Sequence, residues 1–244
     1  MLQAHNKLIV VTGASSGFGL ELAKELNQQG YPLLLLARRI EILNSLNLKN
    51  TLCKKVDVSN LTSLQEAIQE AEKHFNLPVD CLVNNAGVML LGHLDKQDPQ
   101  EWQQMFNVNV LGILHGIHAV TPSMKTRKHG TIINISSLAG RKIYDGAAAY
   151  CGTKVAVHTL SEGLRTELAP FNIRVITIAP GVAQTELLNH TTSKEMLALR
   201  KEEAKNMEYT MHAKDVVRAI LFAYQQPQEI CIREIDLAAT CQLR

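Results

Sequence analysis

The chain alternates short apolar runs with longer amphipathic stretches from one end to the other. The first run, residues 7–11, reads KLIVV, and an unbroken apolar run of this kind is typical of a strand buried on both faces. Further strands are expected at 32–37, within 50–58 and 79–87, at 130–136 and 173–180, and within 229–237. Strands separated by helices imply right-handed crossovers. The sequence therefore predicts an α/β fold, a Rossmann-like, doubly wound parallel sheet of seven strands with helices on both faces.

The stretches between the strands have the apolar spacing of helices. Helices are expected at 18–29, at 61–75 behind an Asn60 cap, over much of 99–124, and at 147–168. No linker or internal repeat divides the chain, so residues 1–244 are expected to form one domain. The least sheet-like part, residues 184–212, is polar and dotted with Met and Leu, which favours a lid over the substrate site.

Composition excludes several classes of function. The net charge of +2 is too small to suggest a nucleic-acid or membrane-surface partner. The five cysteines are far apart and form no C-x-x-C pair, so neither a disulfide framework nor a metal site is predicted. The N-terminal apolar run is too short for a signal peptide or a membrane span, and a reducing, cytoplasmic setting is expected.

Small, polar and glycine residues follow the predicted strands, where a doubly wound sheet binds its ligand. The first strand runs into TGASSGFG, a glycine turn that can bring backbone N–H groups close to a pyrophosphate. Asp57 is placed to meet an adenine amino group, and Thr185 a nicotinamide carboxamide. The cofactor-binding residues predicted in this way are Gly13, Ser15, Ser16, Gly17, Phe18, Gly19, Asp57, Val58, Asn84, Ala86, Gly87, Pro180, Gly181, Val182 and Thr185.

The end of the second strand predicts which dinucleotide is bound. A carboxylate at this point binds the ribose 2′-hydroxyl of NAD, whereas arginine accommodates the 2′-phosphate of NADP. Here the strand ends in Ala37, Arg38 and Arg39, with no acid. We therefore expect NADP. The alternative is that the two arginines are solvent-exposed residues at the start of a helix, which would give the same sequence.

Tyr150 and Lys154 lie four residues apart, on one face of the predicted helix 147–168. Taken alone, the pair is typical of a surface tyrosine packed on a lysine stem. The phenol has an ordinary pKa near 10, and a neighbouring ammonium can lower such a pKa by about 1–3 units. With Ser137 arriving at the same rim from the fifth strand, the pair becomes a candidate for proton transfer.

Together these motifs resemble the short-chain dehydrogenase/reductase family over nearly the whole chain. The resemblance rests on Thr12–Gly19, Asp57, Asn84–Gly87, Asn109, Ser137, the Tyr150/Lys154 pair and Pro180–Gly181, in the family's order. It implies that Tyr150 is the general acid or base and that Ser137 polarises the substrate oxygen. It further implies that Lys154, besides acting on the phenol, holds the cofactor ribose. Asn109 is then expected to anchor a water in a proton relay; a helix-interior asparagine that satisfies a local carbonyl is the alternative.

The glycine turn, the arginines and the C-terminal ending resemble an NADP-dependent subgroup acting on serine and 3-hydroxy acids, including a clavulanate-pathway reductase. The expected substrate is a small alcohol or hydroxy acid, or the matching ketone or aldehyde. It would be contacted by Ser137, Leu138, Tyr150, Arg141, Met89 and Leu187. The resemblance also implies a homo-oligomer, a tetramer or a dimer. Two alternatives stay open: a 3-oxoacyl-carrier-protein reductase, for which residues 125–129 form the only basic run, and a non-catalytic NADP-binding regulator.

Overall fold

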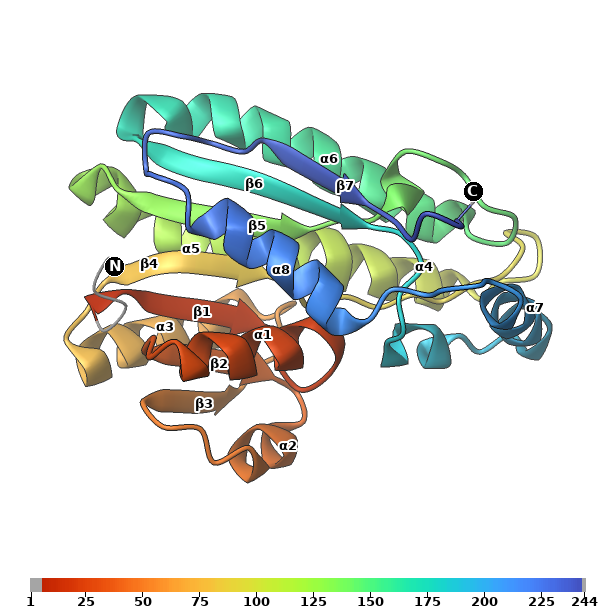
Figure 1. Cartoon of the computed structure of the whole chain (residues 1–244), viewed down its shortest axis with the longest axis horizontal. Coiled ribbons are helices and arrows are strands. Elements are labelled where there is room, and N and C mark those ends of the chain that lie inside the picture. The colour runs from red at the N-terminus through yellow and green to blue at the C-terminus, as the bar shows by residue number, and fades with distance from the viewer. Residues whose placement is uncertain (1–5, 243–244) are drawn as a thin grey trace.

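The computed structural model describes residues 6–242, so the first five residues of the N-terminal stretch and the last two of the C-terminal ending lie outside it. The predicted seven-stranded sheet is confirmed. All strands run parallel in the order β3-β2-β1-β4-β5-β6-β7 (Figure 1). The strands are β1 (Leu8–Thr12), β2 (Leu33–Ala37), β3 (Thr51–Lys55), β4 (Val79–Asn84), β5 (Gly130–Ile135), β6 (Ile173–Pro180) and β7 (Glu234–Leu237).

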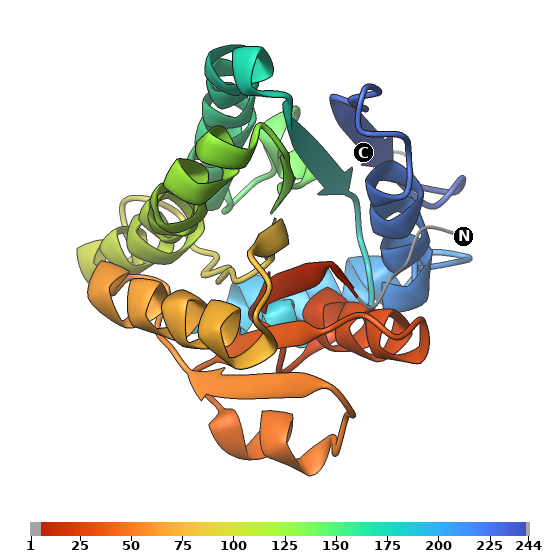
Figure 2. The ribbon, with the colours of Figure 1, turned by 90° about the vertical axis from the view of Figure 1, so that its left-hand side faces the viewer.

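Helices cover both faces of the sheet, as Figure 2 shows in a view along the strands. On one face lie α1 (Gly17–Gln28) and α8 (Ala213–Tyr224), packed against each other. The other face carries α3 (Leu61–Phe75), α5 (Gly112–Arg127) and α6 (Ala148–Leu168), while the short α2 (Ile40–Ser45) contacts β2 and β3. The central strands are therefore enclosed on both sides. This accounts for their unbroken apolar sequence, because neither face of such a strand meets water.

Helix α3 begins and ends at the predicted residues, and the residues at its two ends explain why. The Asn60 side chain accepts a hydrogen bond from the Ser63 N–H at 3.0 Å, which satisfies one of the free donors of the first turn. At the other end, Asn76 adopts a left-handed conformation that stops the helix.

The helical stretch predicted at 99–124 is interrupted. It consists of α4 (Pro99–Phe106), a π-helical turn at Asn107–Leu111 (η2), and α5. Such turns widen a helix by one residue and are frequent at functional sites. The turn places Asn109 entirely inside the protein.

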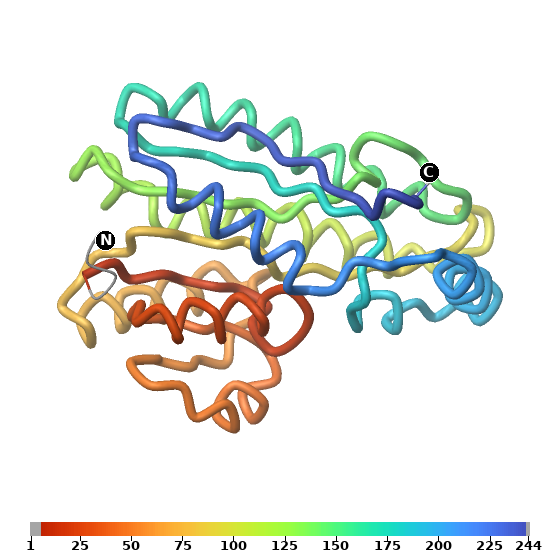
Figure 3. Tube along the Cα trace, in the orientation of Figure 1, coloured from red at the N-terminus to blue at the C-terminus, as the bar shows by residue number. Residues whose placement is uncertain are grey.

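Beyond β6 the chain leaves the sheet and returns over its carboxyl edge. This excursion contains a 3₁₀ turn, η5 (Glu186–His190), and an amphipathic helix, α7 (Lys194–Lys205), which stands beyond the strand ends in Figure 3. A helix within 184–212 was not predicted from the sequence. Across residues 6–242, no helix has the length and apolarity needed to cross a membrane.

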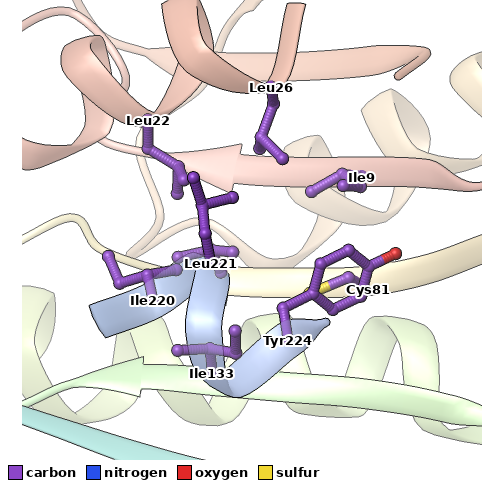
Figure 4. A pocket seen from close by; sticks show the side chains of 9 residues that line it. Ile9, Leu22, Leu26, Cys81, Ile133, Ile220, Leu221 and Tyr224 are labelled. Carbon is purple, nitrogen blue, oxygen red and sulfur yellow. The ribbon is translucent and has the colours of Figure 1, made fainter. Parts of the chain in front are cut away.

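A small void remains in the core between α1, α8 and the central strands (Figure 4). It measures about 10 Å³ and is lined by apolar side chains, among them Leu22, Leu26 and Ile220, with Cys81 and Tyr224 at its edge. A volume of this size is at the lower limit for a single water. It is therefore a packing defect of the core and not a substrate site.

Candidate active site

The carboxyl ends of β1 and β4 lie side by side where the strand order reverses, and the glycine turn occupies this point. Thr12 fastens the two ends together, since its hydroxyl oxygen accepts hydrogen bonds from the N–H groups of Asn85 and Ala86, both at 3.0 Å. The Asn85 side chain donates in return to the carbonyl oxygens of Thr12 at 2.9 Å and Gly13 at 3.1 Å. The turn is thus a fixed surface before any ligand arrives.

Glycine is required at Gly13 for two separate reasons. Its φ of +64° lies in the left-handed region, and a methyl group there would stand 2.7 Å from the Cα of Ala86. Helix α1 begins immediately after this turn, with Ser16 at its cap position and no side-chain cap bond. The first N–H groups of the helix, at Gly17, Phe18 and Gly19, therefore point out of its end as donors for an anion.

The two arginines after β2 have different surroundings. Arg39 donates through Nε to the Ser15 hydroxyl at 3.3 Å, and its Nη1 lies 3.0 Å from the Glu186 carboxylate on η5. Arg38 acts on Asp57: burial raises the pKa of that carboxyl, but hydrogen bonds from Ser59 and the Arg38 charge outweigh it, and the net pKa is lowered. Arg39 therefore borders the glycine turn through Ser15, and Arg38 lies near Asp57; a contact of either arginine with a 2′-phosphate stays a prediction.

The structure brings Ser137, Tyr150 and Lys154 together at the ends of β5 and β6. Ser137 lies at the start of a 3₁₀ turn, η3 (Leu138–Gly140), where its hydroxyl accepts from the Ala139 N–H at 3.1 Å and donates to the Pro180 carbonyl oxygen at 3.3 Å. Its side chain also makes a hydrogen bond with the Tyr150 hydroxyl. Lys154 donates from Nζ to the carbonyl oxygen of Ile135 at 3.0 Å, and the same nitrogen lies 5.8 Å from the Tyr150 ring centre.

Lys154 is not among the groups that shift the pKa of Tyr150 in this structure, so a lowering of that pKa by Lys154 and the nicotinamide stays a prediction. Burial raises the pKa of Tyr150 strongly, and only the hydrogen bond from Ser137 opposes it. Burial also lowers the pKa of Lys154 to about 8. The sequence argument missed this because both side chains are almost fully buried, and burial penalises their charged forms before either acts on the other.

Asn109 is fully buried and joins two elements. Its amide nitrogen donates to the Val88 carbonyl oxygen at 2.9 Å and to the Thr153 hydroxyl at 3.1 Å, while its oxygen accepts from the Val88 N–H at 2.8 Å. The side chain thus holds the loop after β4 against α6, which fits the structural alternative more closely. A part for Asn109 in a proton relay stays a prediction.

Three predicted cofactor residues turn their side chains elsewhere. Asn84 is a correction: it donates to the Asn134 side chain at 2.9 Å inside the sheet, because side chains alternate along a strand and position 84 faces α5. Phe18 packs against the core beneath α1. Val58 is buried against Gly112 of α5.

The remaining predicted cofactor residues line the rim. Gly87 adjoins Asn109, and the Thr185 methyl packs beside Gly17 and caps η5. Gly181 and Val182 are tied to the C-terminal segment through the Leu237 carbonyl and the Gln242 side chain.

The predicted substrate residues divide into two groups. Met89 packs on an apolar cluster that includes Tyr150, and Leu188, next to the predicted Leu187, joins it there. Leu138 is half-buried in η3. Arg141 does not reach this cluster, because its guanidinium forms an ion pair with Glu234 of β7, with Nε 3.2 Å from Oε1. Its predicted contact with a substrate carboxylate is not what this structure favours.

Residue Met196 of α7 was missed by the sequence analysis. It is buried in the same apolar cluster, against Gly146 and close to Tyr150. The Thr191 hydroxyl also bonds to the Met89 carbonyl at 3.3 Å. The segment 184–212 therefore packs on the apolar cluster that contains Tyr150, and its function as a lid stays a prediction. Single Met residues in a polar stretch gave no signal that could have identified this one.

A parallel sheet with a glycine turn at its switch point and a Ser/Tyr/Lys set at the same edge defines a dinucleotide-type oxidoreductase fold. A sequence model described as "short chain dehydrogenase" matches residues 7–196. The chain belongs to this family of oxidoreductases. Among the described residues, no group of three or more His, Cys, Asp or Glu side chains is placed to hold a metal ion.

Similar proteins agree with this assignment. An uncharacterized oxidoreductase of Staphylococcus saprophyticus is 38% identical over 99% of both chains, and one of Listeria monocytogenes is 36% identical over 97% of this chain and 98% of its own. Among solved structures, the closed form of serine dehydrogenase complexed with NADP+ aligns with a TM-score of 0.91 and 30% identity, over 97% of this chain and 96% of that one.

Proposed function

We propose that this protein is an NADP(H)-dependent reductase of small ketones or aldehydes, which it interconverts with the matching alcohols. The observation that carries the proposal is the contact of Tyr150 with Ser137 at the rim of the glycine turn. The resemblance to NADP-bound serine dehydrogenase supports the same reaction class.

The residues at the turn fit the cofactor. The left-handed Gly13 and the close approach of Ala86 leave room for a pyrophosphate but none for a side chain. Arg39 and Ser15, with no acid after β2, match a 2′-phosphate better than a 2′-hydroxyl. When bound, NADPH supplies the hydride.

The chain's own residues then handle the proton. Ser137 donates a hydrogen bond to the substrate carbonyl oxygen and polarises it. Because its pKa is raised, Tyr150 stays protonated at neutral pH, and it gives its proton to the same oxygen as the carbon receives hydride. The charge of Lys154, whose ammonium lies 5.8 Å from the Tyr150 ring centre, would stabilise the phenolate that remains until solvent returns a proton.

The substrate pocket favours uncharged substituents. Its lining beside Tyr150 is apolar, with Val88, Leu90 and Met196 among the buried members. Arg141 is engaged by Glu234, and His93 lies 3.7 Å from the Asp145 carboxylate. A small neutral ketone or aldehyde therefore fits better than a free hydroxy acid.

The carrier-protein alternative receives no support from the basic run at 125–129. Arg127 donates to the Val79 carbonyl and His129 contacts Asp80, both at the start of β4. The run thus lies at the end of the sheet opposite the glycine turn. A carrier bound there would be too far from Tyr150 to deliver its acyl group.

We also propose a homo-oligomer. Phe106, Leu111 and Val155 are exposed apolar side chains on α4, η2 and α6. A second copy of the chain would cover them. Sedimentation equilibrium tests this, and a monomer at every concentration would contradict it.

The reductase proposal is tested by mixing the protein with NADPH and a panel of ketones, aldehydes and oxo acids. We expect oxidation of NADPH with at least one small neutral carbonyl compound, and NADPH to be preferred over NADH. Binding of NADPH without turnover on any compound would favour the non-catalytic regulator instead.

A further inference from the structure

His158 lies one helical turn beyond Lys154 on α6 and is buried directly beneath the Ser137 turn. Its Nε2 is 3.3 Å from the carbonyl oxygen of Ser137. A carbonyl oxygen only accepts hydrogen bonds, so Nε2 must carry the proton in this contact. The same oxygen accepts from the Gly140 N–H at 2.9 Å, which closes the 3₁₀ turn. His158 therefore donates a hydrogen bond to the backbone of Ser137, the proposed catalytic serine.

The ring packs closely against this turn. A methyl group at Gly140 would stand 2.6 Å from Nε2 of His158 and 2.9 Å from the carbonyl oxygen of Lys154. Glycine at this position is what lets the turn lie flat on the imidazole. The position of Ser137 is consequently coupled to the position of the ring.

The other ring nitrogen faces an acid from a distant part of the chain. Nδ1 is buried and makes no well-directed hydrogen bond, but it lies 3.0 Å from a carboxylate oxygen of Glu234 on β7. If the ring were neutral with its proton on Nε2, the Nδ1 lone pair would point at this negative charge. The doubly protonated ring removes the conflict and satisfies both neighbours.

The charged groups around the ring are balanced. Burial raises the pKa of Glu234, but hydrogen bonds from Arg141 and Asp236 and the charge of His158 outweigh it, and the pKa is lowered. The pKa of Asp236 is raised, first by burial and then by Glu234. Two cations, Arg141 and His158, thus lie beside the charged carboxylate of Glu234. The neighbouring Asp236 keeps its proton more readily than Glu234 does.

We propose that His158, oriented by Glu234, is a positioning residue for Ser137 in the reaction proposed above. Its Nε2 holds the Ser137 carbonyl oxygen and so keeps the Ser137 side chain in place beside Tyr150. It touches neither substrate nor cofactor, and it acts only through the geometry of the Ser137 turn.

Two substitutions separate the nitrogens of the ring. In His158→Gln the amide nitrogen reaches the place of Nε2, while in His158→Asn it reaches only the place of Nδ1. We expect His158→Gln to keep kcat within about threefold of the wild type and His158→Asn to lower it by tenfold or more. The Kd for NADPH should be unchanged in both. His118→Asn, on the exposed side of α5, is the matched control and should behave as the wild type.

One further readout distinguishes positioning from a general loss of structure. Hydrogen–deuterium exchange of the peptide covering 136–142 should speed up in His158→Asn and not in His158→Gln.

Equal kcat values in the wild type and both variants would overturn the inference. An equal loss of kcat in His158→Gln and His158→Asn would also overturn it, as would a loss of kcat that follows a loss of NADPH affinity. The exchange measurement needs no turnover. If the wild type reduced no carbonyl compound, the proposed function would fail, while the exchange rates would still show whether His158 holds the Ser137 turn.

Discussion

The same glycine-to-alanine change in two helices gives a sharp test of the packing around the glycine turn. Gly19 lies in the first turn of α1 and Gly163 in the interior of α6. Alanine is favoured over glycine in a helix interior by about 0.5–1 kcal/mol. Nothing lies within 4 Å of a methyl group at Gly163, so Gly163→Ala should raise the free energy of unfolding by about that amount.

A methyl group at Gly19 meets a different environment. It would stand 2.6 Å from the Gly13 carbonyl oxygen, 3.1 Å from the Ala14 Cα, and against the Asn85 amide. Overpacking of this kind costs about 1–3 kcal/mol, and two of these contacts are backbone that cannot swing aside. Gly19→Ala should therefore be less stable than Gly163→Ala by about 1.5–4 kcal/mol, the sum of these two effects. It should also bind NADPH at least tenfold more weakly, because the turn that receives the pyrophosphate is displaced.

Urea unfolding of the cofactor-free variants measures the first quantity, and fluorescence titration with NADPH the second. Gly163→Ala must keep the wild-type Kd for the comparison to hold. If Gly19→Ala were as stable as Gly163→Ala and bound NADPH as the wild type does, the close contact between α1 and the glycine turn would be refuted.

Three other substitutions probe buried and charged groups. The pKa of Lys154 is lowered from 10.5 to about 8. Burying this ammonium therefore lowers the free energy of unfolding by its full amount below pH 8, and by less as the pH rises to 10.5. Lys154→Met should raise the free energy of unfolding by at most about 3 kcal/mol at pH 7. This gain should shrink towards pH 10 in urea unfolding, and a gain independent of pH would contradict the burial argument. Tyr224→Phe removes a 2.6 Å hydrogen bond to the Asp80 carboxylate in the core and should lower the free energy of unfolding by about 1.5–3 kcal/mol, without altering kcat; an unchanged denaturation midpoint would show the bond to be unimportant. Glu186→Gln frees Arg39 from an exposed ion pair worth about 0.2–1 kcal/mol. NADPH should therefore bind about two- to fivefold more tightly, while the Kd for NADH stays constant. Equal changes in the Kd of both cofactors would mean that Arg39 does not contact the 2′-phosphate.

Much of the fold could be predicted because its signals are local. The strands around β1 are buried on both faces and therefore read as unbroken apolar runs. The start of α3 follows from one cap residue, Asn60. By contrast, α7 and the π turn at Asn107–Leu111 depend on packing against distant segments, and no periodicity in the sequence predicts them.

The site was predictable in its residue types and less so in their partners. The glycine turn and the Ser137, Tyr150 and Lys154 set are where the sequence places them. Partners from remote strands changed the details: Glu234 of β7 engages Arg141 and faces His158, two contacts that no spacing along the chain encodes. The strong burial that raises the pKa of Tyr150 is likewise a property of the folded protein.

The most direct test of the central claim compares the wild type with Tyr150→Phe, using NADPH and the carbonyl compound that the wild type reduces best. Turnover is followed by the loss of reduced cofactor, and NADPH binding is measured separately. The account predicts that Tyr150→Phe loses turnover by at least a hundredfold, within the range for loss of a general acid, while its Kd for NADPH stays within about twofold of the wild type. Residual activity close to that of the wild type, or activity lost only in step with NADPH affinity, would contradict the role of Tyr150 as the proton donor.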